Sequence, residues 1–179
     1  MISLQASDFE LFGLPTAFAL DRSQLDLQWK SLQREAHPDR FASEGAAAQR
    51  VAMQWSVRIN EAYNRLKDPL KRAAYLCELH GAAVNAENNT SMPAAFLMQQ
   101  MAWREALDDC KLLKDSQAQI EALESLLEEV DASRAQVLLQ AAALIDEDQN
   151  YPAAVGQVRA LMFIEKFASE VQHGIDART

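Results

Sequence analysis

The sequence predicts an almost entirely helical protein, of the all-α class, on three observations. Residues that favour helices (Ala, Leu, Gln and Glu) are abundant, whereas the 179 residues include only five glycines and five prolines. No β-branched run of strand length occurs, and apolar residues recur at helical intervals along most of the chain. The apolar fraction of 49% is normal for a protein with a buried core, so we expect folding without disulfides.

Residues 1–80 are expected to form a small domain, in which a short helical turn in "DFELFGLP" precedes three longer helices. The longer helices begin at favoured N-cap residues, Asp21, Ser43 and Asp68, and Gly81 ends the last of them. Apolar residues at helical spacing give the second and third helices one inward face each, so these two helices should pair antiparallel. The inward faces are Leu25, Trp29, Leu32 and Ala36, and Ala48, Val51, Trp55, Ala62 and Leu66.

Residues 81–92 are predicted to be a linker, because "AAVNAENNTSMP" is rich in asparagine and has no periodicity. Residues 93–179 then predict three helices, near 93–113, 116–147 and 151–172, each with an apolar face. Their connections are short, which implies antiparallel neighbours and a C-terminal three-helix bundle.

The charge distribution argues against nucleic acid and against an anionic membrane as partners. Before Gly81 the chain has 10 basic and 10 acidic residues; from Gly81 onward it has 7 and 16, so the whole net charge of -9 lies in the second half. No segment approaches the roughly 18 to 20 apolar residues of a membrane helix, and the simplest location is the cytoplasm. Cys77 and Cys110 lack the spacing of a zinc site, so we expect no metal and no cofactor.

A loop that begins with His37, Pro38 and Asp39, here called the HPD loop, separates the second and third helices. An imidazole and a carboxylate suggest an acid/base pair or half a metal site. However, no nucleophile motif accompanies them, and a catalytic metal needs about three protein ligands, so we expect no catalytic residues. A plain alternative is that the proline stops one helix and the aspartate starts a turn. The setting favours a function, because Lys30 and Arg34 project from the outward face of the preceding helix.

"LQREAHPDRFAS" between two antiparallel helices, followed by "INEAYNRLKDPLKRAAY", resembles the J domain, the module that activates DnaK-type chaperones. The resemblance covers about residues 8–80. It implies that the HPD loop stimulates ATP hydrolysis by the chaperone, and that the docking residues are Lys30, Arg34 and Arg40. Arg40 stands where many J domains carry lysine, which keeps the charge but changes the geometry.

The rest of the chain narrows this resemblance. The Gly/Phe-rich linker and the Cys-x-x-Cys-x-Gly-x-Gly repeats, which J proteins for general unfolded clients usually carry, are missing from the sequence. Instead, "RAAYLCELHG", "AFLMQQMAWREALDD" and "VRALMFIEKF" are similar to the HscB family, the J-type co-chaperones of bacterial iron-sulfur cluster assembly. This resemblance implies two partners, the DnaK-type chaperone HscA and the cluster scaffold IscU.

Helical periodicity supports a client surface in the second half by a separate argument. In the helix near 93–113, the sector that includes Phe96 and Trp103 suffices for the core, while a second sector of large apolar residues continues into acidic ones. On the last helix, Phe163 and Phe167 are expected to point away from the core stripe. Surplus apolar residues beside charge are typical of protein-binding patches, and the alternative is that they widen the core.

The HscB resemblance implies a scaffold-binding role for Leu97, Met98, Met101, Glu105 and Phe163. Ala102 stands where relatives often have an acidic residue, which predicts a weaker acidic strip. The sequence thus predicts a two-domain co-chaperone that catalyses nothing itself. The alternatives are a general J-domain protein, which would bind many denatured chains, and an enzyme built on His37 and Asp39, which would show turnover.

Overall fold

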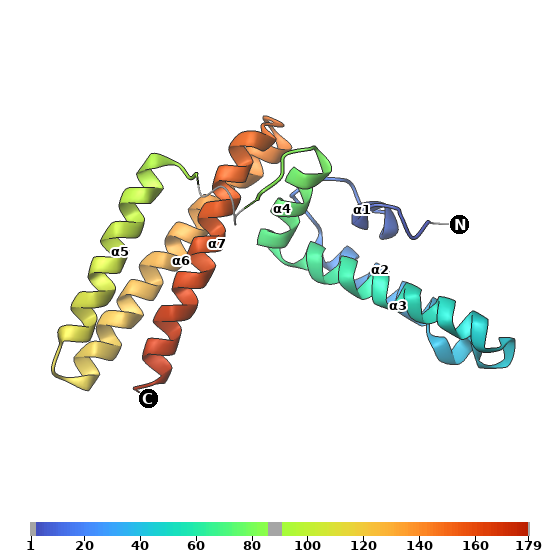
Figure 1. Ribbon diagram of the computed structural model, residues 1–179, viewed down its shortest axis with the longest axis horizontal. Coiled ribbons are helices and arrows are strands. Elements are labelled where there is room, and N and C mark those ends of the chain that lie inside the picture. The colour runs from blue at the N-terminus through green and yellow to red at the C-terminus, as the bar shows by residue number, and fades with distance from the viewer. Residues whose placement is uncertain (1–2, 86–90, 179) are drawn as a thin grey trace. The chain divides into compact units, whose positions relative to one another are not determined.

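The computed structural model describes residues 3–85 and 91–178, and these residues contain helices and connections but no strands (Figure 1). The chain divides into two compact units, Met1–Leu76 and Cys77–Thr179. The predicted all-α fold, with an N-terminal helical hairpin and a C-terminal three-helix bundle, is confirmed. Residues 86–90 of the predicted linker lie outside the described residues.

The first unit is built on five helical segments, and local capping by aspartate sets the starts of two of them, α2 (Arg22–Glu35) and α4 (Pro69–Leu79). The five segments are α1 (Asp8–Leu11), α2, the 3-10 helix η1 (Pro38–Glu44), α3 (Ala46–Lys67) and the greater part of α4. The Asp21 carboxylate accepts the backbone N–H groups of Ser23 and Gln24, and the Asp68 carboxylate accepts those of Leu70 and Lys71. Both aspartates therefore cap their helices as the sequence predicted.

The start and the buried face of α3 differ from the prediction. Ser43 lies inside η1, and the helix begins after Gly45, whose φ of 95° suits glycine far better than any other residue. Val51 is exposed, and Ala52 is buried in its place. The N-terminal part of α3 packs against η1, so the inward direction there is set by a neighbour that the α2–α3 pairing alone does not reveal.

Polar side chains hold α2 and α3 together as an antiparallel pair. The Trp29 indole stacks on Tyr63 with ring centroids 4.6 Å apart and donates a hydrogen bond of 3.0 Å to Asn60 Oδ1. One turn further along α2, Gln33 donates to Asn60 and accepts from the Ser56 hydroxyl. Residues later in α2 contact residues earlier in α3, so the two helices run in opposite directions, as predicted.

A buried ion pair fastens α1 to α3. The carboxylate of Asp8 is fully buried and lies 2.8 Å from Arg58 Nη1 and 3.1 Å from Arg65 Nη1. The backbone N–H of Asp8 donates to the Tyr75 hydroxyl at 3.0 Å. Removing one member of such a pair leaves a charge without its partner, so this contact ties the short first helix firmly to the unit.

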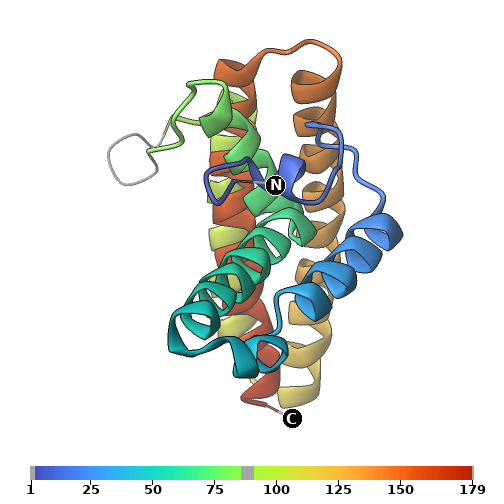
Figure 2. The ribbon, with the colours of Figure 1, turned by 90° about the vertical axis from the view of Figure 1, so that its right-hand side faces the viewer.

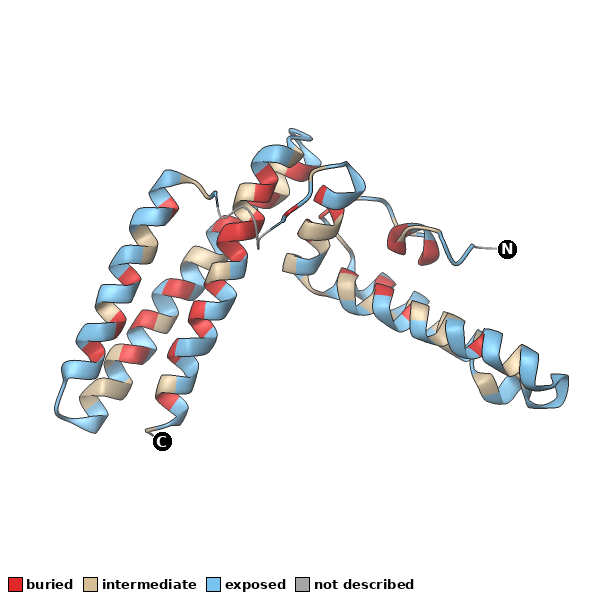
Figure 3. Ribbon diagram, viewed as in Figure 1, coloured by how far each residue is buried: buried red, intermediate tan, exposed pale blue. Residues whose placement is uncertain are grey.

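The second unit is an antiparallel bundle of α5 (Ala94–Leu112), α6 (Ser116–Asp146) and α7 (Tyr151–Asp176), joined by short turns (Figure 1). Asp115 and Asn150 cap the starts of α6 and α7. Buried residues follow the facing sides of the helices, and exposed residues cover the outer sides (Figure 3). The inward sector predicted for α5 is confirmed, since Phe96, Trp103, Leu107 and Cys110 are all buried.

Candidate functional site

The HPD loop joins the ends of α2 and α3 at the tip of the hairpin (Figure 2). His37 is extended, with φ -63° and ψ 126°, as a residue before proline should be, and Pro38 is the first residue of η1. The imidazole Nδ1 accepts the backbone N–H of Asp39 at 3.3 Å, which makes His37 the cap of η1. The side chain of Asp39 is 90% exposed. The loop therefore presents an imidazole and a carboxylate to solvent.

Three predicted docking cations gather beside the loop. Arg34 Nε donates to the carbonyl oxygen of Lys30 at 3.3 Å, and Arg40 Nη1 reaches back to the carbonyl oxygen of Arg34 at 3.2 Å. Cations at the C-terminal end of a helix are favoured by the helix dipole. Within residues 3–85 and 91–178, no acidic group forms an ion pair with any of these three side chains. Their charge is thus available to a partner, although Lys30 still attracts the Asp26 carboxylate electrostatically.

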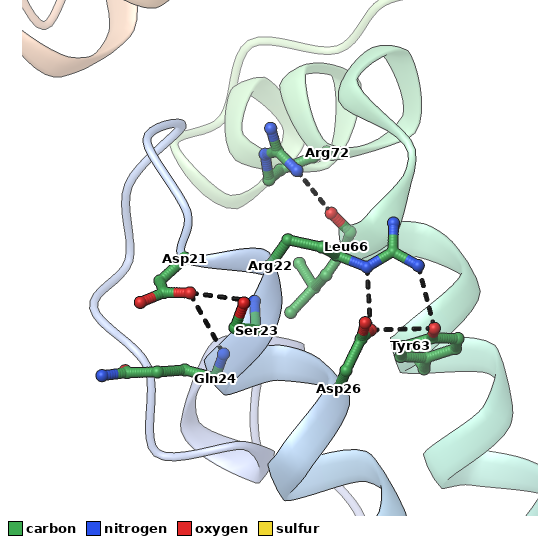
Figure 4. Close-up of polar contacts among 8 residues, drawn as sticks. All are labelled: Asp21, Arg22, Ser23, Gln24, Asp26, Tyr63, Leu66 and Arg72. Carbon is green, nitrogen blue, oxygen red and sulfur yellow. Dashed lines mark hydrogen bonds and ion pairs between the residues drawn. The ribbon is translucent and has the colours of Figure 1, made fainter.

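The other end of α2 behaves differently, because its cation is neutralised (Figure 4). Arg22 Nε lies 2.8 Å from Asp26 Oδ1, and Arg22 Nη2 donates to the Tyr63 hydroxyl, which in turn donates to Asp26. The hydrogen bond from Arg22 is the largest cause that lowers the pKa of Asp26 below its usual value. The basic surface thus begins at Lys30 and is confined to the half of α2 nearest the HPD loop.

A shallow hollow of about 380 Å³ lies on this same face of α2. Its lining includes the aliphatic side chain of Leu27, which is exposed, and the basic side chains of Lys30 and Arg34. Leu27 has no role in the function predicted from the sequence. The signal that would have identified it is its position, one turn before Lys30 and two turns before Arg34, on a face that is otherwise polar.

The second predicted surface lies on α5. Leu97, Met98 and Met101, here called the α5 patch, are exposed, and exposed Glu105 follows one turn after Met101. Phe163 of α7 is half-buried and meets α5 through an edge-to-face contact with Phe96, with ring centroids 5.9 Å apart. The fold therefore brings Phe163 to the helix that carries the other four predicted residues.

The prediction that Phe167 points away from the core is wrong. Phe167 is fully buried, because its ring stacks between Trp103 of α5 at 5.7 Å and Phe163 at 5.8 Å. The periodicity of α7 alone predicted too narrow an inward face. The helix packs against α6 on one side and meets α5 on another, so more of its surface is buried. Only Phe163 of the two remains partly accessible.

Neither surface has the groups for metal or thiol chemistry. Among the residues that the structure describes, no three His, Cys, Asp or Glu side chains come together in a way that could hold a metal ion. Both cysteines are buried, and burial raises the pKa of the Cys77 thiol to about 11, which keeps it protonated at neutral pH. No helix in the described part of the chain is both long and apolar enough to cross a membrane.

Comparison with known proteins finds relatives named HscB. A family model described as the HSCB C-terminal oligomerisation domain matches residues 92–172. Two proteins named co-chaperone protein HscB homolog, from Burkholderia multivorans and Paraburkholderia xenovorans, are 48% and 50% identical to this chain. Each match spans 171 residues, which cover 96% of this chain and 95% of the relative.

Solved structures extend the similarity to the whole fold. Chaperone HscB from Vibrio cholerae superposes with a TM-score of 0.82 at 36% identity, over 97% of this chain and 100% of that one. Human co-chaperone protein HscB superposes with a TM-score of 0.85 at 21% identity, over 97% and 84%, which is a likeness of fold alone. With curated relatives this similar over nearly its full length, the chain belongs to the HscB family of co-chaperones.

Proposed function

We propose that this chain stimulates ATP hydrolysis by the DnaK-type chaperone HscA and delivers the iron-sulfur cluster scaffold IscU to it, and so aids the maturation of iron-sulfur proteins. The chain acts in the cytoplasm and catalyses nothing itself. One observation carries the proposal: one unit has an exposed histidine-aspartate loop beside cations that form no ion pair in the described part of the chain, and the other has an exposed apolar patch beside acidic residues.

The first surface suits an acidic partner such as a chaperone. Lys30, Arg34 and Arg40 supply a local positive field that speeds the encounter with an acidic surface and orients it. The HPD loop stands next to them and supplies the specific contact. Leu27, exposed among these cations, adds an apolar contact to an otherwise polar interface.

The second surface suits a folded client with an apolar area bordered by basic residues. The two methionines of the α5 patch are flexible and polarizable, so they adapt to the shape of a partner. Glu105 and the exposed Asp109, further along α5, favour basic groups on that partner, and so does Asp108, which also pairs with Lys111 at 3.4 Å. Binding of an unfolded chain would not need an apolar patch bordered by acidic residues at fixed positions. For this reason we favour one specific folded scaffold over general unfolded clients.

Two surfaces on one chain explain how delivery works. A co-chaperone that holds the scaffold through α5 raises the local concentration of the scaffold near the chaperone that the HPD loop engages. Stimulated hydrolysis then traps the scaffold on the chaperone and favours transfer or release of the cluster.

The decisive experiment is single-turnover ATP hydrolysis by HscA, with this protein and IscU added separately and together. We expect each to stimulate modestly and the pair to stimulate synergistically. Equal stimulation by IscU and by a denatured unrelated protein would identify a general J-domain protein instead. ATP hydrolysis by this chain without HscA would contradict the absence of an enzymatic role.

A further inference from the structure

A closed cluster of four aromatic rings joins α5 to α7. Phe96 and Trp103 of α5 meet edge to face at 6.0 Å, Trp103 stacks on Phe167 of α7 at 5.7 Å, Phe167 stacks on Phe163 at 5.8 Å, and Phe163 returns to Phe96 at 5.9 Å. Three of these rings are buried, whereas Phe163 is only half-buried. The cluster therefore has one accessible corner, Phe163, which is the residue to which the HscB resemblance gives a scaffold-binding role.

Arg104 of α5 covers this corner. Its guanidinium carbon lies 5.6 Å from the centroid of Phe163 and 5.1 Å from that of Phe167, within the range of a cation-π interaction. Arg104 Nη1 also lies 2.6 Å from Glu170 Oε2 on α7. One planar side chain thus touches two rings and one carboxylate of the neighbouring helix, a combination that guanidinium geometry permits and an ammonium group does not reproduce.

Arg104 also stands in line with the α5 patch. It follows Leu97 by seven residues and Met101 by three, so these three side chains share one face of the helix. Arg104, which contacts Phe163, therefore lies next to the α5 patch on the same face of α5. A cross-helix ion pair between partly exposed groups contributes little by itself, so the contact with the rings is the part that matters.

We propose that Arg104 is a positioning residue for scaffold binding: it holds the half-exposed Phe163 ring against α5, so that Leu97, Met101 and Phe163 present one preformed surface. This inference rests on the proposed function, because IscU is the ligand whose affinity reports it. Without Arg104, Phe163 keeps its contacts with Phe96 and Phe167 but loses the cation over its ring, so the ring gains freedom that binding must remove. Arg104 acts through Phe163 and makes no contact with IscU of its own.

The test is a double-mutant cycle, with IscU affinity measured by calorimetry on the full chain. We expect Arg104→Ala to weaken binding about fivefold in the otherwise unchanged protein, the size of one exposed cation-π interaction. In a Phe163→Ala background, Arg104→Ala should change affinity less than about twofold, since the ring it positions is gone. Arg104→Lys, which keeps the charge but loses the planar stacking, should restore only part of the lost affinity.

Arg134 supplies a matched control in the same bundle. It also joins two helices by an ion pair, with Arg134 Nε 3.0 Å from Glu165 Oε1, but it lies on α6 and covers no ring among the described residues. Arg134→Ala should leave IscU affinity unchanged and lower the thermal midpoint no more than Arg104→Ala does, because it removes ion pairs without a ring contact.

Three outcomes would overturn the inference. Equal weakening by Arg104→Ala with and without Phe163 would mean that Arg104 contacts IscU directly. Weakening that Arg134→Ala reproduces would assign Arg104 to general stability. Unchanged affinity in Arg104→Ala, while alanine variants of the α5 patch lose binding, would refute positioning and leave the proposed function standing. If the α5 patch variants also bind normally, the proposed function itself fails.

Discussion

Replacing the whole α5 patch, Leu97, Met98 and Met101, with alanine is expected to abolish most scaffold affinity while leaving the fold intact. The side chains are 45%, 74% and 75% exposed, so they contribute little to the core of the free protein. Surface substitutions of this kind usually change the free energy of unfolding by less than about 1 kcal/mol.

The loss of affinity follows from the area that remains to be buried. Burying a whole leucine or methionine side chain contributes about 1.5 to 3 kcal/mol. Scaled by exposed fraction, Leu97 can contribute about 0.7 to 1.4 kcal/mol and each methionine about 1 to 2 kcal/mol. Because alanine keeps its Cβ and coverage is incomplete, we expect a total loss of about 2 to 4 kcal/mol, or about 30-fold to 1000-fold in the dissociation constant.

The assay is calorimetric titration of IscU into the wild type and the triple variant, beside denaturant unfolding of both. Leu139→Ala is the matched control, because Leu139 is 73% exposed on α6, outside the patch. It should change the affinity less than about twofold, in line with the near-neutral effect of residues outside binding hot spots. An unchanged affinity in the triple variant would refute the reasoning. A large loss of unfolding free energy would show instead that these side chains belong to the core.

Three further predictions concern the loop, the basic face and a buried thiol. His37→Gln or Asp39→Asn should abolish stimulation of the chaperone ATPase and change the free energy of unfolding by less than about 1 kcal/mol, since both side chains are exposed; full stimulation by both variants would exclude the assigned role. Replacing both Lys30 and Arg34 with glutamate should weaken stimulation of the chaperone ATPase. Wild-type stimulation should fall with added salt, because exposed charges are screened over about 8 Å at physiological ionic strength. Electrostatic docking is refuted if neither change has an effect. Because burial raises the pKa of Cys77 to about 11, the thiol stabilises the fold fully below pH 9, and this contribution is lost as the pH rises toward 11, where the unfolded chain is already ionised. In a Cys110→Ser variant, labelling of the Cys77 thiol at about pH 8.5 should be slow in the folded protein and fast in urea. Equal labelling rates would contradict the raised pKa of Cys77.

Local sequence determined the helices and the candidate loop. Asp21 and Asp68 cap their helices as predicted because a cap requires only backbone groups two or three residues away. The HPD loop consists of consecutive residues, so it can be recognised in the sequence without knowledge of any tertiary contact. The exposed sector of α5 was also predictable, because Phe96, Trp103, Leu107 and Cys110 already supply a complete inward face and leave the α5 patch over.

Tertiary structure decided what each helix meets on its remaining sides. Phe167 is buried because Trp103, 64 positions earlier in the chain, stacks on it, and Val51 is exposed because η1 rather than α2 covers the start of α3. The Asp8 ion pairs and the Arg104 contact with Phe163 likewise join residues about 50 to 60 positions apart, from different helices. Helical periodicity reports only which side chains share a face of one helix. Which of those faces is covered depends on the packing of whole elements, and that is a property of the folded chain alone.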